Sequence, residues 1–174
     1  MKNLSKLIAV ALTSAALLFT SSVKAQTTPA NAWRLGIGLE TGVPTGIENE
    51  HHKFELGGTA RLQYGISSQF ALTLTSGYYN FFPTTNPVTG TDYKTIDIVP
   101  VKLGFKEFFA KNIYFGGEAG AGFVTTTGLT KFVWSPGLGY AGKNLDIGVR
   151  YEGFDGQGLD FGVIGLRIAY GFSL

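Results

Sequence analysis

Charged side chains recur at alternate positions of otherwise apolar segments, and they are the residues in this chain whose types and spacing could most clearly do chemistry. A charge taken out of water is stable only when it is paired. Equal numbers of bases and acids therefore predict ion pairing in a closed interior. The bases are Arg34, Arg61, Lys102, Lys106, Arg150 and Arg167, and the acids are Glu40, Glu55, Asp97, Glu118, Asp146 and Glu152.

Three short segments could bind a ligand, and each has a simpler interpretation. Residues 137–144 nearly spell a phosphate-binding loop, but the last residue is Asn where that motif needs Ser or Thr. Residues 153–160 carry two carboxylates for Ca²⁺, although too few ligands are fixed for a specific site. Residues 48–52 place His51 and His52 in one predicted external loop, where Zn²⁺ or Cu²⁺ would be held only weakly. The sequence predicts no cofactor and no bound metal.

The composition excludes several classes of protein. Only 15% of the residues are charged, against about 25% in a typical soluble domain, and there are 25 glycines in 174 residues. Such a chain has too little charge for the surface of an ordinary cytosolic enzyme. The absence of Cys excludes disulfide scaffolds, Cys-ligated zinc and Cys nucleophiles.

The first 25 residues have the pattern of a cleaved signal peptide. Lys2 and Lys6 precede an apolar stretch over 7–19, and Ala25 supplies a small residue before a cleavage site at Gln26. Removing three lysines leaves 11 basic against 12 acidic residues, so no basic patch for nucleic acid remains. The predicted organisation is a signal peptide (1–25), a short leader (26–32) and a β-barrel domain (33–174).

Beyond the leader, apolar residues alternate with Gly and polar residues at a period of two, which is typical of β-strands. A phase change at Pro100 predicts a β-bulge near Val99 and Pro100. Eight strands are predicted, at 33–43, 54–66, 70–82, 94–106, 113–125, 132–140, 145–151 and 164–173.

The connections between these strands alternate in length. Long or Gly/Pro-rich connections (45–53, 83–93 and 153–159) and an intermediate one (126–131) alternate with short turns. The turns 67–69 and 142–144 are tight, and 107–112 is less so. Long loops at one end, short turns at the other and an even strand number are typical of transmembrane β-barrels. The fold prediction is an all-β, eight-stranded antiparallel up-and-down transmembrane barrel.

Aromatic residues and the polar face decide between a membrane barrel and a soluble lipocalin-like barrel. A face made mostly of Gly with a few balanced charges suits the crowded interior of an eight-stranded barrel. Aromatic side chains near the strand ends match the interfacial girdles of membrane barrels. These aromatics are Trp33, Phe54, Tyr64, Phe70, Tyr78, Phe132, Tyr140, Tyr151, Tyr170 and Phe172.

Counting positions along each strand brings seven of the inward charges to a similar height, at the predicted barrel waist. We expect four bases and three acids to meet there as a plug, with Glu55 and Asp97 above them. The alternative is a set of solvated charges in a wet lumen. The predicted interior cluster consists of Glu40, Arg61, Lys102, Glu118, Arg150, Glu152 and Arg167.

Four segments resemble the small outer-membrane β-barrel proteins of Gram-negative bacteria, of the OmpA-barrel and OmpX type. They are residues 34–40, 98–102, 117–120 and 165–172, and the resemblance covers 33–174. It implies a location in the outer membrane, contact with its lipid bilayer, and recognition of the C-terminal strand by the barrel-insertion machinery. It implies no common activity.

The functional prediction is a structural or surface-interaction role for a monomeric barrel with a charge-plugged lumen and variable loops. One alternative is a narrow, porin-like solute pore. The other is a lipid-modifying enzyme, which is disfavoured because both histidines lie on a predicted loop with no Ser at a strand position facing them. The sequence therefore predicts no enzymatic activity.

Overall fold

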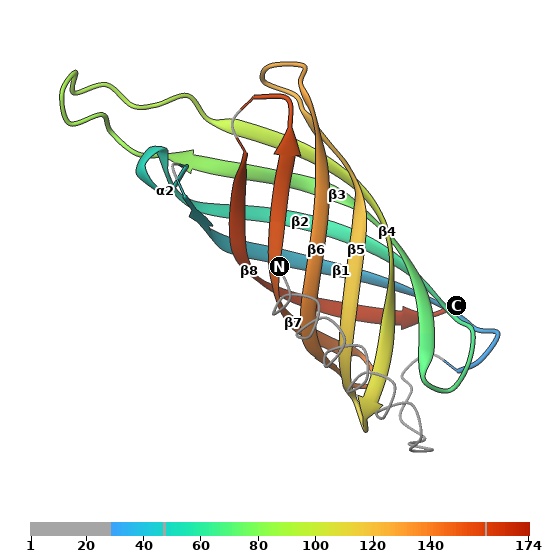
Figure 1. Ribbon diagram of the computed structural model, residues 1–174. Helices are drawn as coiled ribbons and strands as arrows, with labels where there is room; N and C mark the ends of the chain where they lie inside the picture. The colour runs from blue at the N-terminus through green and yellow to red at the C-terminus, as the bar shows by residue number, and fades with distance from the viewer. Residues whose placement is uncertain (1–28, 47, 159) are drawn as a thin grey trace, which may run out of the picture.

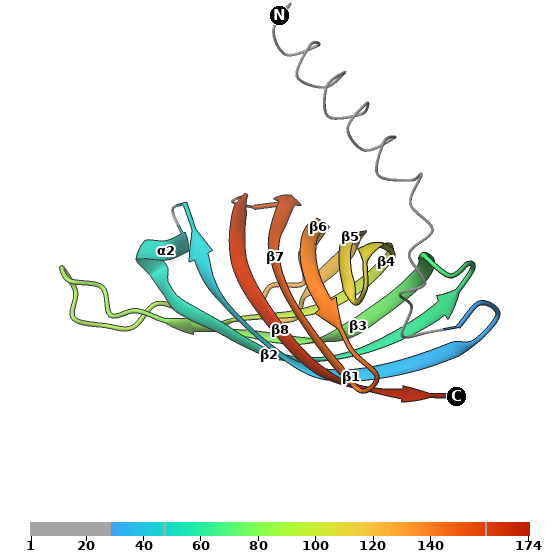
Figure 2. The same cartoon turned by 90° about the horizontal axis from the view of Figure 1, so that it is seen from below.

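The computed structural model describes residues 29–46, 48–158 and 160–174, which form one closed antiparallel barrel (Figure 1). Each strand pairs with its neighbours in the chain, and β1 pairs with β8 to close the sheet (Figure 2). The predicted fold class is confirmed. The strands are β1 (Trp33–Thr45), β2 (His52–Gly65), β3 (Phe70–Pro83), β4 (Ile96–Ala110), β5 (Ile113–Val124), β6 (Thr130–Ala141), β7 (Leu145–Gly156) and β8 (Phe161–Ser173).

The predicted signal peptide lies outside the described residues, as do residues 26–28 of the predicted leader. Between β1 and β2 lies a four-residue helix, α2 (Glu48–His51). No helix in the described part of the chain is long and apolar enough to cross a membrane.

Short turns join the strands at one end of the barrel and longer connections join them at the other, as predicted. β4 runs to Ala110, so the predicted connection 107–112 shrinks to a tight turn in which Asn112 adopts a left-handed φ of 74°. β7 runs to Gly156, so most of the predicted loop 153–159 belongs to a strand. The longest connection, 84–95, projects as a hairpin closed by a bridge between Thr85 and Asp92 (Figure 1).

The predicted bulge at Val99 and Pro100 is wrong. The register of β4 on β5 runs through these residues without a shift, and Pro100 is a buried, inward-facing residue. Irregular pairing occurs instead between His52 and Phe54 on β2 and between Phe108 and Ala110 at the end of β4. The apparent phase change arose because Ile98 faces inward, where an apolar residue was not expected.

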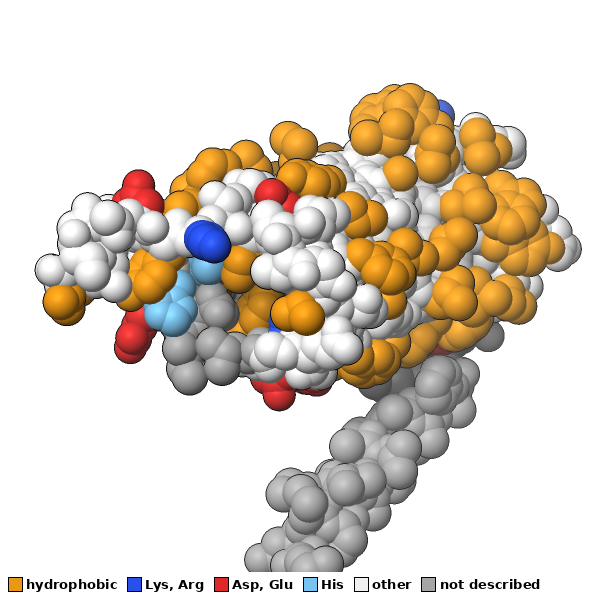
Figure 3. Space-filling model, turned by 90° about the horizontal axis from the view of Figure 1, so that it is seen from above, with side chains coloured by type: hydrophobic (Ala, Val, Ile, Leu, Met, Phe, Trp, Pro, Cys, Tyr) orange, Lys and Arg blue, Asp and Glu red, His pale blue; other side chains and the backbone are white. Residues whose placement is uncertain are grey.

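The outer wall is apolar over the middle of the strands. Leu39 and Leu103 are 68% and 67% exposed, and Figure 3 shows hydrophobic side chains gathered over the wall away from the loop end that carries the histidines. Aromatic pairs lie on this outer face, including Trp33–Tyr64 and Phe54–Phe82. An apolar belt with aromatic residues near its margins is the surface that a lipid bilayer covers.

A charge on this belt should destabilise the barrel. We expect Leu103→Arg to lower the free energy of unfolding by about 2–4 kcal/mol, because an Arg near the bilayer midplane must be desolvated. Unfolding is carried out in lipid vesicles, and the folded fraction is measured from the different migration of folded and boiled protein in SDS gels. The matched control is Val88→Arg at the loop tip, where the wild-type side chain is 91% exposed, and a change below about 0.5 kcal/mol is expected. Equal stability of the two variants would contradict the membrane assignment of this face.

The hairpin 84–95 should face the cell exterior. Gly90 has a left-handed φ of 68° and open space around it, so an epitope inserted there disturbs no packing. We expect antibody to label this epitope on intact cells. Labelling that required a permeabilised outer membrane would reverse the topology.

Candidate functional site: the interior charge network

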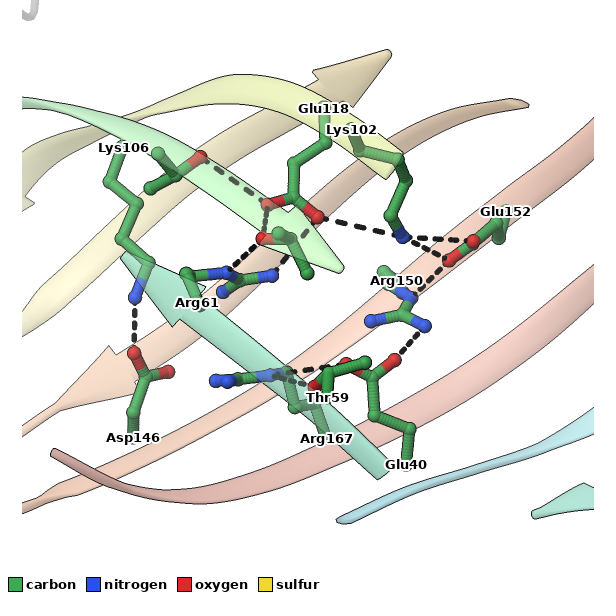
Figure 4. Close-up of polar contacts among 12 residues, drawn as sticks. Glu40, Thr59, Arg61, Lys102, Lys106, Glu118, Asp146, Arg150, Glu152 and Arg167 are labelled. Atoms are coloured by element: carbon green, nitrogen blue, oxygen red, sulfur yellow. Dashed lines mark hydrogen bonds and ion pairs between the residues drawn. The ribbon is translucent and has the colours of Figure 1, made fainter. Parts of the chain in front are cut away.

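The seven side chains of the predicted cluster all point into the barrel, from six different strands (Figure 4). Because side chains alternate between the two faces of a strand, residues at every second position share the lumen. Glycines and threonines occupy the intervening inward positions and leave room for the long charged side chains. Each of the seven has at least one oppositely charged partner among the others.

Glu40 of β1 has two cations and two hydroxyl groups as partners in the network. It contacts the guanidinium of Arg150, and its Oε1 accepts a hydrogen bond of 3.1 Å from Arg167 Nε. The hydroxyl of Thr59 donates to the same oxygen at 2.6 Å, and Tyr79 donates to Oε2 at 3.2 Å. A carboxylate with two cations and two hydroxyl donors has its lone pairs satisfied inside the lumen.

Glu152 and Lys102 link β7 to β4 across the lumen. Lys102 Nζ lies 2.9 and 3.0 Å from the two carboxylate oxygens of Glu152, and it also donates to Tyr79 Oη at 3.1 Å. Arg150 Nε lies 2.6 Å from Glu152 Oε2. Arg150 therefore contacts both Glu152 and Glu40, and it links the ion pair of Lys102 and Glu152 to the ion pairs of Glu40 in one network.

Glu118 of β5 completes the network on the opposite side. Its Oε2 lies 3.0 Å from Arg61 Nη2 and 3.6 Å from Lys102 Nζ. Thr75 donates a 2.6 Å hydrogen bond to Oε1, and Arg61 Nε donates to Thr75 Oγ1 at 2.9 Å. Glu118 thus holds two cations that would otherwise repel each other.

A second group of charges lies nearer the turn end. Lys106 forms a short ion pair with Asp146, and Tyr114 donates to the same carboxylate at 2.8 Å. The ammonium of Lys106 also lies 4.1 Å from the centre of the Tyr114 ring, which adds a cation–π contact. Arg34 donates to the carbonyl of Gly142 at 3.2 Å. These three charges were predicted to point inward, and they do.

Tyr79 also belongs to the network, although its role was not predicted from the sequence. Its hydroxyl contacts Glu40, Lys102 and Arg150, and the residue is fully buried. The signal was present in β3, because the odd positions that place Thr73 and Thr75 inside also place Tyr79 inside.

An apolar cap at the loop end of the lumen was also missed. There many inward positions carry large hydrophobic side chains, and the rings of Phe154 and Phe161 stack 4.8 Å apart. The buried Lys131 lies beside them, with Nζ 5.5 Å from the centre of the Phe161 ring. The cap lies between the charge network and the loops. Its buried residues are Tyr79, Phe81, Ile98, Val124, Val133, Phe154, Phe161 and Val163.

Two predicted inward charges behave differently from expectation. Asp97 does not point into the lumen: it follows the outward phase of β4 and accepts a 2.6 Å hydrogen bond from Asn80, which faces outward on β3. Glu55 does face inward and is 2% exposed, but it forms no ion pair and its Oε1 has no hydrogen-bond partner within the described residues. The interior therefore has fewer acids than bases.

The two histidines are not together on a loop. His51 ends α2 and its ring lies 4.4 Å from that of Tyr93, whereas His52 begins β2 and is buried. The irregular pairing between His52 and Phe54 changes the phase of the strand, which turns His52 inward. Its Nε2 lies 3.1 Å from the carbonyl oxygen of Lys94. In the described ranges no group of three His, Cys, Asp or Glu side chains could hold a metal ion.

Solved structures of outer-membrane proteins share this fold. No protein-family model and no curated protein matches this sequence. The outer membrane protein Ail of Yersinia pestis, in a phospholipid bilayer nanodisc, is similar with a TM-score of 0.59 and 15% identity over 82% of this chain and 99% of that one. Ail in complex with the heparin analogue sucrose octasulfate gives a TM-score of 0.59 and 17% identity over the same shares.

The outer membrane protein OprG of Pseudomonas aeruginosa is similar with a TM-score of 0.53 and 9% identity, over 88% of this chain and 99% of that one. Each of these solved chains is matched over nearly its whole length, so the likeness concerns the complete barrel. The apolar outer wall, the charged lumen and the likeness to these solved structures all point to the same type of barrel. The chain is a transmembrane β-barrel of the outer-membrane type, and the resemblance seen in its sequence is confirmed at the level of the fold.

Proposed function

We propose that this protein is a monomeric outer-membrane barrel that passes no solute, with a lumen plugged by its own charges and a structural or surface-interaction role carried by its loops. The observation that carries the proposal is the network that runs across the lumen from Arg61 and Glu118 through Lys102, Glu152 and Arg150 to Glu40 and Arg167. These salt bridges support a closed lumen, because a charge that is already paired binds a passing ion poorly.

The apolar cap supports the same proposal. A solute entering from the loop end would meet Phe81, Phe154 and Phe161, whose ring centres lie 4.8–6.1 Å apart, before it reached the charge network. An apolar constriction opposes the passage of water and ions. The porin-like alternative would require both the cap and the network to open.

The lipid-modifying alternative has little support. An acyl-transfer or hydrolase site needs a nucleophile within hydrogen-bond reach of a base. Of the two histidines, His51 stacks on Tyr93 and His52 bonds to the backbone of Lys94 inside the barrel. We therefore assign no enzymatic activity to this chain.

The loop end is the face we assign to surface interaction. Ail, which shares the fold, has a structure in complex with a heparin analogue. Exposed charges near the loops here have both signs, with Lys53 and Lys94 against Glu50, Asp92 and Asp160. A sulfated polysaccharide would need a basic patch, so we propose a protein or lipid surface as the partner of these loops.

Two further parts of the proposal concern biogenesis. We propose that residues 1–25 direct export and are removed, which leaves Gln26 as the first residue. We also propose that the insertion machinery recognises β8, whose outward aromatic side chains Tyr170 and Phe172 lie 4.8 Å apart near its end.

The closed lumen can be tested by conductance in a planar bilayer. We expect no conductance steps from the wild type, and rare steps from Arg150→Ala, because this change removes the residue that joins Glu40 to Glu152. The control is Lys94→Ala, which removes an exposed cation at the loop end and should stay silent. Discrete steps from the wild type would support the pore instead.

The dry, paired character of the network can be tested by stability. Glu118→Ala leaves Arg61 and Lys102 without this partner, and we expect a loss of about 3–5 kcal/mol in the free energy of unfolding. The measurement is the temperature at which the band of folded protein disappears in SDS. Glu50→Ala, which removes an exposed acid on α2, should have little effect. If both variants unfold at the same temperature as the wild type, the charges are solvated and the proposal of a plug is wrong.

A further inference from the structure

On the turn-end side of the charge network the barrel contains two small cavities of about 40 and about 10 Å³. The larger one also reaches the barrel wall, where the outward-facing Phe105, Leu138 and Val149 line it. Arg61 and Arg167 line both cavities, so we treat the two as one chamber, here called the lower chamber. A buried water needs about 10–15 Å³ of such space. The lower chamber therefore has room for a few waters or for one small ion.

The walls of the lower chamber carry an excess of positive charge. Five bases line it, against only two acids. Both acids are already paired, Glu118 with Arg61 and Lys102, and Asp146 with Lys106. Glu40 and Glu152 pair with Arg150 and Arg167 from the network side, and counted with Lys102 the chamber and the network together still have six bases against four paired acids. The bases that line the chamber are Arg34, Arg61, Lys106, Arg150 and Arg167.

Arg167 directs an unused donor into this chamber. The residue is 3% exposed, and its Nε is occupied by Glu40 and Thr59. Its Nη2 is buried and has no hydrogen-bond partner among the residues that the structure describes. Nη2 lies 3.5 Å from where a Cβ on Gly36 would stand, and Gly36 lines the smaller cavity. In Figure 4 this end of the guanidinium points away from Glu40, toward the side on which Asp146 lies.

We propose that the lower chamber binds a monatomic anion, which is chloride in a saline medium, with Arg167 Nη2 as a direct donor and Arg61 and Arg34 as the surrounding charge. A buried guanidinium with an unmade hydrogen bond and cationic neighbours is costly. Water would satisfy the N–H group but would leave the charge excess in place. An anion would both accept a hydrogen bond from Arg167 Nη2 and offset the excess of positive charge. The chamber is too small for sulfate or phosphate with their hydration.

The bound anion would belong to the plug. Arg61 and Arg167 both line the two cavities, and their positive charges repel each other. An anion between them would hold the lower side of the network together, as Glu118 and Glu40 hold its upper side. This inference concerns the ligand of the lumen and does not depend on whether the loops have a partner.

The direct test is diffraction from crystals of the barrel grown in bromide, whose anomalous signal locates the ion. We expect a bromide peak in the lower chamber within hydrogen-bond distance of Arg167 Nη2. A chamber that contains only water density in bromide would overturn the proposal.

The test in solution compares unfolding temperatures in sodium chloride and sodium gluconate at equal ionic strength, in detergent micelles. Raising the chloride concentration from a value equal to its Kd to ten times that value should increase the equilibrium constant for folding about fivefold. This corresponds to a rise in unfolding temperature of roughly 2–4 °C for a domain of this size. Equal unfolding temperatures in the two salts would mean that screening alone acts, and the proposal would fail.

Two variants and one control separate anion binding from general damage. Gly36→Ala should weaken the chloride dependence, because its methyl group enters the smaller cavity with no contact closer than 3.5 Å and breaks no ion pair. Arg167→Lys keeps the charge but removes Nη2, and the chloride dependence should be lost. Gly58→Ala, which faces outward with its nearest contact at 3.9 Å, should respond to chloride as the wild type does. Chloride dependence that survives both Gly36→Ala and Arg167→Lys would place the anion elsewhere and overturn the site.

Discussion

The rest of this structure depends on one constraint: the inside of a narrow closed barrel has no bulk water with which to stabilise a charge. Closing the sheet satisfies the backbone, since every strand has a partner on each side. The same closure confines the inward side chains, so a buried carboxylate is stabilised by cations within the lumen, although Glu55 has no such ion pair among the described residues. Glu40 and Glu118 each have two cations and hydroxyl donors. The network is thus a consequence of closure as much as of the charges themselves.

The glycine content follows from the same constraint. Long side chains inside an eight-stranded barrel need empty positions beside them. A Cβ at Gly171 would stand 2.1 Å from Arg34 Nε, and one at Gly139 would stand 2.4 Å from the Tyr114 ring. These glycines are places where a neighbouring strand's charged or aromatic side chain lies. The alternation of Gly with apolar residues, which first indicated strands, therefore also records where the interior is filled by long side chains.

Periodicity was enough to predict the fold and which faces of most strands point inward, because a period of two is a local property of a strand. It was not enough where a local irregularity changes the phase: His52 turns inward only because pairing is irregular before Phe54. It also failed where an inward residue is apolar, as with Ile98, since polarity was the criterion for facing the lumen. Which charges pair could not be predicted at all, because the partners come from different strands whose relative heights depend on the stagger of the closed barrel.

The lumen is consequently divided along its axis, with an apolar cap near the loops, a paired network in the middle and a cation-rich chamber near the turns. The cap separates the ion pairs from water at the loop end, and Coulomb interactions are stronger where water is excluded. Tyr79 belongs to both layers: its ring packs in the cap while its hydroxyl contacts Glu40 and Lys102. The loops can therefore change in sequence without disturbing the charges, because the residues that shield and orient the network lie on the strands below them.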